Sequence, residues 1–392
     1  MTLKRLFLAH YSGDAQEVAR LARTLRLHGI VPWVDKDGGF AVADDAELEA
    51  RRAIREDCFG LLLYASADGF KRPFIRHVEI DEAWKARQAN PDFALFAVPR
   101  RISFADLTQL STQSFGLDLA RYYTVAIPEG TDLDDAHAQV AEHVLNRVVR
   151  RAASDDGWRL SLQYSTREVL PDQPDDVLCI DATTLYRPGM DSNERSGLLL
   201  RGLTSVKKAI AKACGRPRLS IHGSKHLSAA FVLGRVFAPF EMDIRQTPDS
   251  VWRTDVLVSE NLPLSVTVRE VDSAQQRLFV ELASGYKNIS DGVDAFIATD
   301  KIHPGARLVV QPLDGALNLD NNSCLAMVAR IYMEIERVLQ QQGISEIHLF
   351  GAVPQSLMIM LGRRFRGMPP VFLYEWDGSR YLPGCWVPGG VL

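Results

Sequence analysis

Residues 59–84 read FGLLLYASADGFKRPFIRHVEIDEAW, and this segment decides the fold of the first third of the chain. Its apolar start is typical of a buried strand, and Pro73 suits the first turn of a following helix, where no backbone N–H is needed. Glu79 is then expected about two turns into that helix, just past the carboxyl end of a strand, where open α/β sheets bind ligands. The alternative is a surface Glu79 that pairs with Arg76 on the same helix face.

The bulk composition is that of an ordinary globular protein. The chain has 392 residues, 46% of them hydrophobic and 24% charged, and a net charge of −4. This length predicts two or three domains, and the charge gives no reason to expect binding to DNA or RNA polymers. Five scattered cysteines predict free thiols in a reducing compartment. Since no apolar run resembles a signal peptide or approaches roughly 20 residues, we expect a cytoplasmic protein without membrane contact.

Strand and helix patterns alternate through the first 150 residues, which predicts a doubly wound parallel sheet. The predicted strands are 6–9, 30–34, 59–64, 93–98 and 122–127. The predicted helices run through 18–25, 48–54, 73–89 and 136–148. Pro32 predicts an edge position for the second strand. The charged, turn-forming segment 150–157 predicts a boundary between a domain at 1–152 and another at 158–392.

Four short segments occur in the order and spacing found in TIR domains. They are FLAHYSGD (7–14), GIVPWVD (29–35), YAS (64–66) and VEI (78–80). The first domain therefore resembles a TIR domain, which implies a flavodoxin-like fold. In TIR domains that consume NAD, the glutamate of the family's third sequence box is catalytic, and Glu79, in the segment 78–80, falls on that position.

NAD cleavage requires few catalytic groups. The bond between ribose and nicotinamide already has a cationic leaving group, so one oriented carboxylate suffices to stabilise the oxocarbenium-like centre. NAD is then a substrate, and no cofactor is expected. His10, Tyr11 and Trp33 are expected at the same sheet edge, against the nicotinamide; ordinary packing is the alternative. Asp35 and Lys36 begin the loop 35–45, which in the family moves to complete the site; a solvated loop is the alternative.

The C-terminal region contains an internal duplication of a strand–glycine–helix unit. Five identical pairs lie 128 residues apart, namely Gly223 and Gly351, Ser228 and Ser356, Gly234 and Gly362, Arg235 and Arg363, and Phe237 and Phe365. The repeat predicts two fused Rossmann-like halves at about 158–255 and 256–392, and chance similarity of strand–helix patterns is the alternative. Each half brings a loop and a helix N-terminus to a strand end, which suits a phosphate-bearing ligand.

The Leu-Gly-Arg units and the ending VFLYEW (371–376) resemble a SAVED domain. That family is similar to two fused CARF units and senses cyclic oligonucleotides in the bacterial anti-phage systems called CBASS. With the TIR-like domain, the chain resembles the TIR-SAVED effectors, whose ligand is a cyclic tri-adenylate. Lys225 or Arg187 would pair with phosphate, and Tyr186, His226 or Trp376 would stack on adenine. Ser224 and Gln355 are the remaining candidate residues for cyclic-nucleotide binding.

Each candidate has a structural alternative, a solvated charge or a buried aromatic ring. Arg235 and Arg363 fit structural bridging at least as well as ligand contact. His222 and His226 straddle a strand end without an acidic or cysteine partner, so no metal site is predicted.

Two functions follow from these patterns. The first is an NAD glycohydrolase that a cyclic oligonucleotide activates, through head-to-tail association of TIR domains or filaments, with NAD depletion as the result. The second is a non-enzymatic assembly module coupled to a nucleotide sensor.

Overall fold

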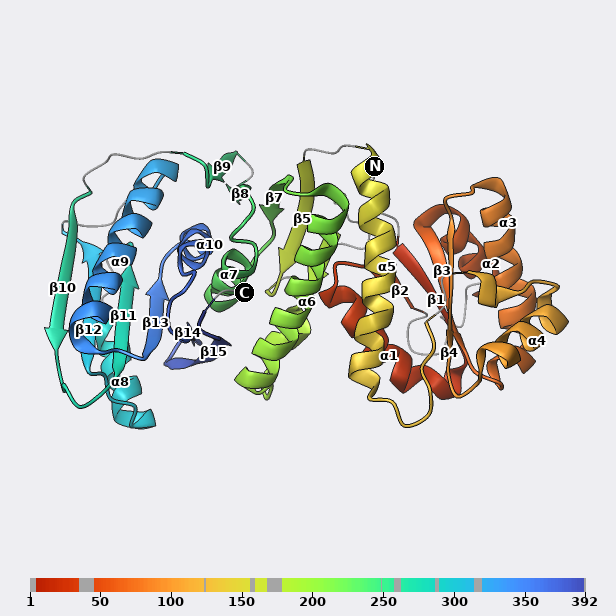
Figure 1. The fold of residues 1–392 in the computed structure, drawn as a ribbon, viewed down its shortest axis with the longest axis horizontal. Coiled ribbons are helices and arrows are strands. Elements are labelled where there is room, and N and C mark those ends of the chain that lie inside the picture. Colours follow the sequence, from red (N-terminus) through yellow and green to blue (C-terminus); the bar gives the residue numbers. More distant parts are fainter. Residues whose placement is uncertain are drawn as a thin grey trace. The chain divides into compact units, whose positions relative to one another are not determined.

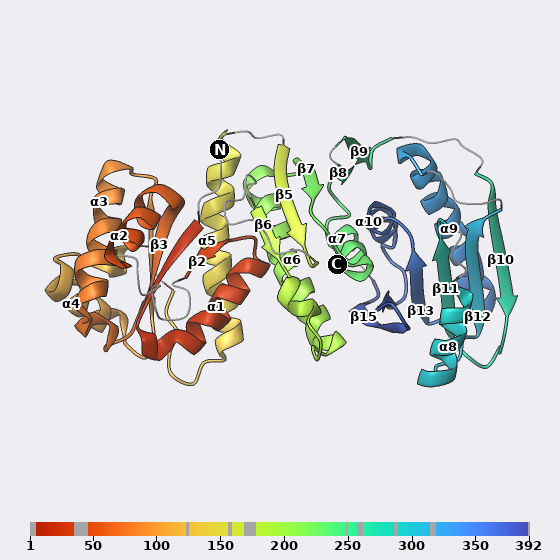
Figure 2. The ribbon, with the colours of Figure 1, turned by 180° about the vertical axis from the view of Figure 1, so that it is seen from behind.

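The computed structural model describes residues 5–34, 46–122, 125–155, 159–167, 178–247, 249–256, 262–285, 289–313 and 319–390. Contacts divide the chain into two compact units, Met1–Gly157 with Leu170–Asp181, and Trp158–Val169 with Ala182–Leu392. Figures 1 and 2 show the elements of both units from opposite sides. Within the described ranges, no helix combines the length and the apolar content that a bilayer crossing requires.

The first unit is built around a parallel sheet of order β2-β1-β3-β4. Its elements are β1 (Arg5–His10), α1 (Ala15–Leu27), β2 (Pro32–Trp33), α2 (Ala46–Arg52), the π-helical η3 (Ala53–Asp57), β3 (Cys58–Ala65), η5 (Ile75–Ile80), α3 (Asp81–Ala89), β4 (Ala94–Pro99), α4 (Phe104–Phe115), α5 (Leu133–Asp155) and β6 (Leu178–Asp181). The predicted edge position of Pro32 is confirmed, and so are the predicted strands at 6–9, 59–64 and 93–98.

Two features of the first unit differ from the sequence expectation. The predicted strand 122–127 is reduced to one parallel bridge between Arg100 and Ile127, with residues 123 and 124 outside the described ranges. Helix α4 was not predicted, because it buries only Leu107 and Ser111 and so lacks a clear apolar stripe. Mixed α/β architecture with parallel pairing is nevertheless the observed fold class.

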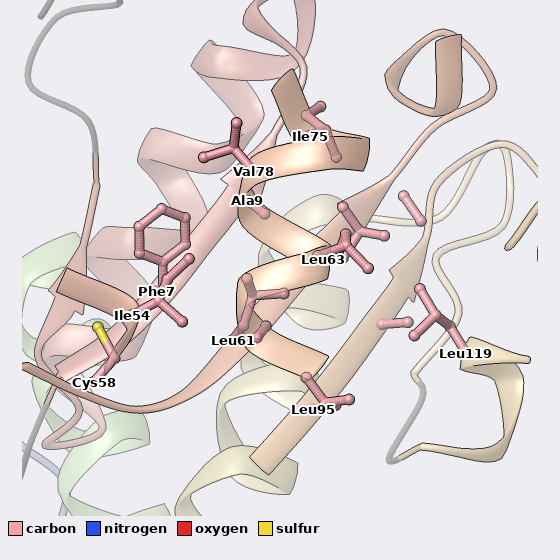
Figure 3. Close-up of a cluster of buried hydrophobic side chains, with 14 of the residues drawn as sticks. Phe7, Ala9, Ile54, Cys58, Leu61, Leu63, Ile75, Val78, Leu95 and Leu119 are labelled. Carbon is pink, nitrogen blue, oxygen red and sulfur yellow. The ribbon is translucent and has the colours of Figure 1, made fainter. Parts of the chain in front are cut away.

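The helix that carries Glu79 is continuous from residue 73 to residue 89, and its middle part, η5, is π-helical. Ile75 and Val78 project from it into the buried cluster that holds Phe7 and Leu63 of the sheet (Figure 3). This apolar packing fixes the helix beside the sheet. Single π-helical turns are rare and frequently occur at functional sites.

The second unit contains two halves of the same architecture. The first half comprises β5 (Arg159–Ser165), α6 (Ser192–Cys214), β7 (Arg218–His222), α7 (Leu227–Val236), β8 (Met242–Thr247) and β9 (Ser250–Arg253). The second half comprises β10 (Leu264–Glu270), β11 (Arg277–Ala283), α8 (Ser290–Asp300), β12 (Ala306–Pro312), α9 (Asn321–Gln342), β13 (Glu346–Ala352), α10 (Gln355–Arg364), β14 (Val371–Trp376) and β15 (Tyr381–Val387).

Four strands in each half follow the same order. The first half has the order β5-β7-β8-β9 and the second β11-β13-β14-β15, and in both the last pair alone is antiparallel. Strands β12 and β10 extend the second sheet beyond β11. Equivalent strand ends therefore occur twice in this unit.

Helices α7 and α10 pack against each other through the duplicated glycines. A Cβ added to Gly234 would lie 1.9 Å from the carbonyl oxygen of Ile359, and one added to Gly362 would lie 2.2 Å from that of Phe231. Each glycine is thus a notch that admits the backbone of the other helix. In both copies of the Leu-Gly-Arg repeat, the glycine lies where the backbone of the other helix approaches.

The duplicated arginines bridge the halves. Arg235 donates to the carbonyl oxygen of Gly390. Arg363 donates from Nε to the carbonyl oxygen of Ala238 (3.2 Å) and from Nη1 to that of Thr254 (3.1 Å). Of the two alternatives that the sequence left open, structural bridging is the one observed.

Candidate functional site

A cavity of about 490 Å³ lies in the second unit, at the carboxyl ends of β5, β7, β11 and β13. Its lining residues are Arg167, Ser224, Lys225, Leu227, Ser284, Ala352, Val353, Pro354 and Gln355. The volume falls within the range of about 300–1,000 Å³ that is usual for small-molecule sites. Two of the described lining residues are cations and none is acidic, so the cavity favours an anionic ligand.

The two loops at the cavity are held by equivalent backbone contacts. Gly223 has φ +96°, and a Cβ there would lie 2.5 Å from the carbonyl oxygen of Tyr164. Only glycine permits this turn out of β7. The Ser224 carbonyl then accepts the N–H of Thr166 (2.9 Å). In the second half, the Ala352 carbonyl accepts the N–H of Ser284 (3.2 Å).

Lys225 is the buried cation of the cavity, with 3% of its surface exposed. Its Nζ donates to the carbonyl oxygens of His222 (3.1 Å) and Gly223 (2.6 Å). Burial lowers the pKa of Lys225 to about 7, because low-dielectric surroundings disfavour the ammonium form. An anion in the cavity would restore the charge on this side chain.

Gln355 ties the loop of the first half to the helix of the second. Its Oε1 accepts the backbone N–H of Lys225 at 3.1 Å. At the start of α7, the Glu375 carboxylate accepts the N–H of Ser228 at 2.6 Å, and burial raises the pKa of Glu375. Of the predicted ligand residues, Ser224, Lys225 and Gln355 are the ones brought together around the cavity.

Tyr186 and His226 stack on each other instead of presenting open faces. Their ring centroids are 4.0 Å apart and their planes differ by 4°. The Arg195 guanidinium lies 4.8 Å from the centre of the Tyr186 ring. Burial lowers the pKa of His226 to about 4, and its Nδ1 is 2.8 Å from the Thr166 hydroxyl. An adenine could therefore reach the shared ring faces only by separating the pair.

Two other candidates lie away from the described cavity lining. Arg187 is exposed directly after Tyr186, and Trp376 is 46% exposed with its edge on Tyr381. Conversely, Arg167 and Ser284 line the cavity although sequence reasoning missed them. Each follows a strand that pairs with a duplicated strand, so the sheet order was the signal that could have found them.

In the first unit, Glu79 is 8% exposed and lies in η5. His10 ends β1, and its Nδ1 is 3.2 Å from the Leu8 carbonyl oxygen. Tyr11 follows, and its hydroxyl accepts from Arg72 Nη2 at 2.9 Å. Trp33 lies opposite Phe7 in the pairing of β2 with β1, and the two ring centroids are 4.5 Å apart. Phe7 precedes His10 by three residues along β1, so Trp33 is level with a position three residues before His10. Asp35 and Lys36 lie outside the described residues.

Two carboxylates of the first unit form ion pairs with arginine side chains. Glu17 accepts from Arg100 Nε at 2.6 Å and from the Tyr64 hydroxyl at 2.7 Å, and the pKa of Glu17 falls to about 2, chiefly through the Arg100 bond. Glu82, 1% exposed, is held by Arg51 and Arg55, and the Arg55 bond is the main reason that its pKa is lowered. These ion pairs fix helices to each other and to the sheet edge.

Residues 203–387 match the family model described as SMODS-associated and fused to various effectors sensor domain, or SAVED. The chain is 24% identical over 193 residues to CD-NTase-associated protein 4 of Acinetobacter sp., a match that spans 47% of this chain and 40% of that relative.

Two solved structures of the Acinetobacter baumannii Cap4 SAVED/CARF-domain containing receptor share the fold. The one with 2'3'3'-cAAA has a TM-score of 0.50 at 15% identity and covers 83% of this chain and 86% of its own. The one with 3'3'3'-cAAA has a TM-score of 0.51 at 15% identity and covers 82% of this chain and 86% of its own.

Proposed function

We propose, on the premise that residues 203–387 form a SAVED sensor domain, that this chain is an NAD glycohydrolase switched on by a cyclic oligonucleotide. The observation that carries the proposal is the cavity at the duplicated strand ends, which is lined by the buried Lys225, by the exposed Arg167 and by no described acidic residue. Cap4 receptors of the same fold are known with cyclic trinucleotides, which makes a cyclic tri-adenylate the expected activator.

The effector half of the proposal concerns the first unit. The order β2-β1-β3-β4, followed by the bridge at Ile127, matches the order of flavodoxin-like sheets and so supports the TIR resemblance. Glu79 lies beside that sheet on a partly π-helical helix, in surroundings that exclude most solvent. The interaction of a carboxylate with a positive charge is stronger there, because little water screens it.

In the proposed reaction, the bond between the ribose C1′ and the nicotinamide nitrogen breaks, and its electron pair leaves with neutral nicotinamide. The Glu79 carboxylate stabilises the positive charge that develops on the ribose. Water then adds to C1′ and loses a proton, which yields ADP-ribose. Ligand binding promotes association of copies in anti-phage defence of the CBASS type, and that association activates the enzyme.

The test is a nicotinamide-release assay on the full chain with NAD, with and without 3′3′3′-cAAA. Release that depends on the cyclic nucleotide is expected. Glu79→Gln should lower the rate by roughly 100-fold or more while the protein still binds the cyclic nucleotide. Glu129→Gln, an exposed substitution in the same unit, serves as the matched control.

Full activity of Glu79→Gln would refute the catalytic assignment. Nucleotide binding and self-association by the wild type without any nicotinamide release would instead favour a non-enzymatic assembly module.

A further inference from the structure

Arg72 lies in the loop between β3 and the helix that carries Glu79, at the carboxyl edge of the first sheet. Its guanidinium covers the ring of Tyr11, with Cζ 4.5 Å from the ring centre, and its Nη2 donates to the Tyr11 hydroxyl at 2.9 Å. Tyr11 itself directly follows β1. The pair therefore joins the loops that leave two neighbouring strands, where open α/β sheets bind their ligands.

The position of the Tyr11 ring is fixed by its surroundings. A Cβ added to Gly13 would lie 2.5 Å from Cε1 of that ring, so glycine is needed to leave room for the ring in this position. A Cβ added to Gly69 would lie 3.7 Å from Cβ of Tyr11 and 3.9 Å from Cδ1 of Ile75. Tyr11 thus packs beside the first turn of the helix 73–89, and its ring is a fixed support for the guanidinium.

Arg72 differs in its partners from two other cations at the same edge of the sheet. Lys71 donates to Asp68 at 2.7 Å, and Arg100 donates to Glu17 at 2.6 Å. Arg72 is exposed and forms no ion pair with any residue that the structure describes. Most of its five N–H donors are therefore left for a ligand, while the stacked ring restricts the orientation of the guanidinium plane.

The spacing of Arg72 and Glu79 suits the proposed substrate. Glu79 follows Arg72 by seven residues, which is roughly 10 Å at a helical rise of about 1.5 Å per residue. In NAD, the nicotinamide ribose alone lies between the reacting C1′ and the diphosphate. A carboxylate at C1′ and a cation at the diphosphate therefore belong within about two helical turns of each other. A guanidinium suits phosphate because it can donate two parallel hydrogen bonds.

We infer that Arg72 binds the diphosphate of NAD, and that Tyr11 positions the guanidinium for this contact. The inference rests on the proposed glycohydrolase function and deepens it, because it names a part of the substrate that the enzyme recognises away from the reacting bond. Tyr11 acts here through Arg72, whereas the sequence pattern suggested contact with the nicotinamide. The enzyme should accordingly prefer NAD to nicotinamide riboside, which has the same reacting bond and no phosphate.

Steady-state kinetics of nicotinamide release by the full chain, with saturating 3′3′3′-cAAA, test the inference. Arg72→Met should raise KM for NAD roughly 10- to 100-fold, the worth of hydrogen bonds to a charged group, and should change kcat little. The constant for nicotinamide riboside, followed as a substrate or as a competitive inhibitor, should stay the same. Lys71→Met, which removes the neighbouring exposed lysine, is the matched control and should behave like the wild type.

Tyr11→Phe is the second arm, and it leaves Arg72 in place. It removes the hydroxyl that accepts from Arg72 and keeps the ring, so KM for NAD should rise by a smaller factor, with nicotinamide riboside again unaffected. A thermal melt of each variant establishes that it is folded. If Arg72→Met does not fold, Tyr11→Phe alone decides the question.

An unchanged KM for NAD in the two variants, or equal changes for NAD and nicotinamide riboside, would overturn the inference and leave the glycohydrolase function intact. If the wild type releases no nicotinamide from NAD under these conditions, the proposed function fails, and the inference fails with it.

Discussion

At the scale of single residues, His137 is the clearest case of a buried titratable group outside the candidate sites. It lies on α5 with no exposed surface, and its ring meets Tyr64 edge-on at 6.2 Å. Neither ring nitrogen has a hydrogen-bond partner among the described atoms. Burial lowers the pKa of His137 to about 4, so the folded protein holds this ring neutral.

His137 should therefore make the protein less stable in mild acid. An unfolded histidine has a pKa near 6.5, so between about pH 6.5 and pH 4 the unfolded chain binds the proton that the folded chain refuses. The free energy of unfolding falls through this window as pH falls, by up to about 3 kcal/mol.

His137→Leu removes this contribution. Urea unfolding at pH 7.5 and pH 4.5 should show that the free energy of unfolding of the variant rises relative to that of the wild type as the pH is lowered. The exposed His303→Leu serves as the control. A difference between His137→Leu and the wild type that does not change with pH would contradict the prediction.

At the same scale, sequence reasoning reached part of the cavity. Ser224, Lys225 and Gln355 could be named because they follow duplicated strands directly. The mutual stacking of Tyr186 and His226 could not, because it joins residues that only the folded chain brings together. Whether Glu79 and its predicted neighbours bind NAD stays a prediction.

At the scale of elements, the crossing of α7 and α10 gives a packing prediction. Gly234→Ala should lower the free energy of unfolding by about 1–3 kcal/mol, because the new methyl group meets the backbone of α10. Gly197→Ala is the matched control on α6, where nothing lies within 4 Å of an added Cβ, and it should raise helix stability by about 0.5–1 kcal/mol. Chemical denaturation of both variants measures the contrast, and equal effects would argue against the close approach.

The same crossing shows how far element-level prediction could go. Apolar runs located β1, β3, β7 and β13, and the offset of 128 residues identified the repeated Leu-Gly-Arg unit. The reason for the glycine lay in the other helix, which no local pattern reveals. Strand β10 was missed although Leu264, Val266 and Val268 alternate with polar residues, which is the pattern of a strand with one apolar face.

At the scale of the whole molecule, the two compact units predict more than one unfolding transition. A cyclic nucleotide at 100 times its dissociation constant should stabilise only the second unit, by about 2.7 kcal/mol. Differential scanning calorimetry of the full chain with 3′3′3′-cAAA measures this. The transition that the ligand raises should be the one that Gly234→Ala lowers. Equal shifts of all transitions would show that the units unfold together.

The contacts between the two halves are reciprocal: Gly234 and Gly362 each face the other helix, and Arg235 and Arg363 each donate to the other half. This reciprocity bears on how the domain evolved. Such reciprocal contacts are what two identical subunits form across a twofold axis. A single half that paired with a second copy of itself through these contacts would present two loops of identical sequence. Joining both copies in one gene let each copy drift separately, so lysine could stand at 225 and valine at 353.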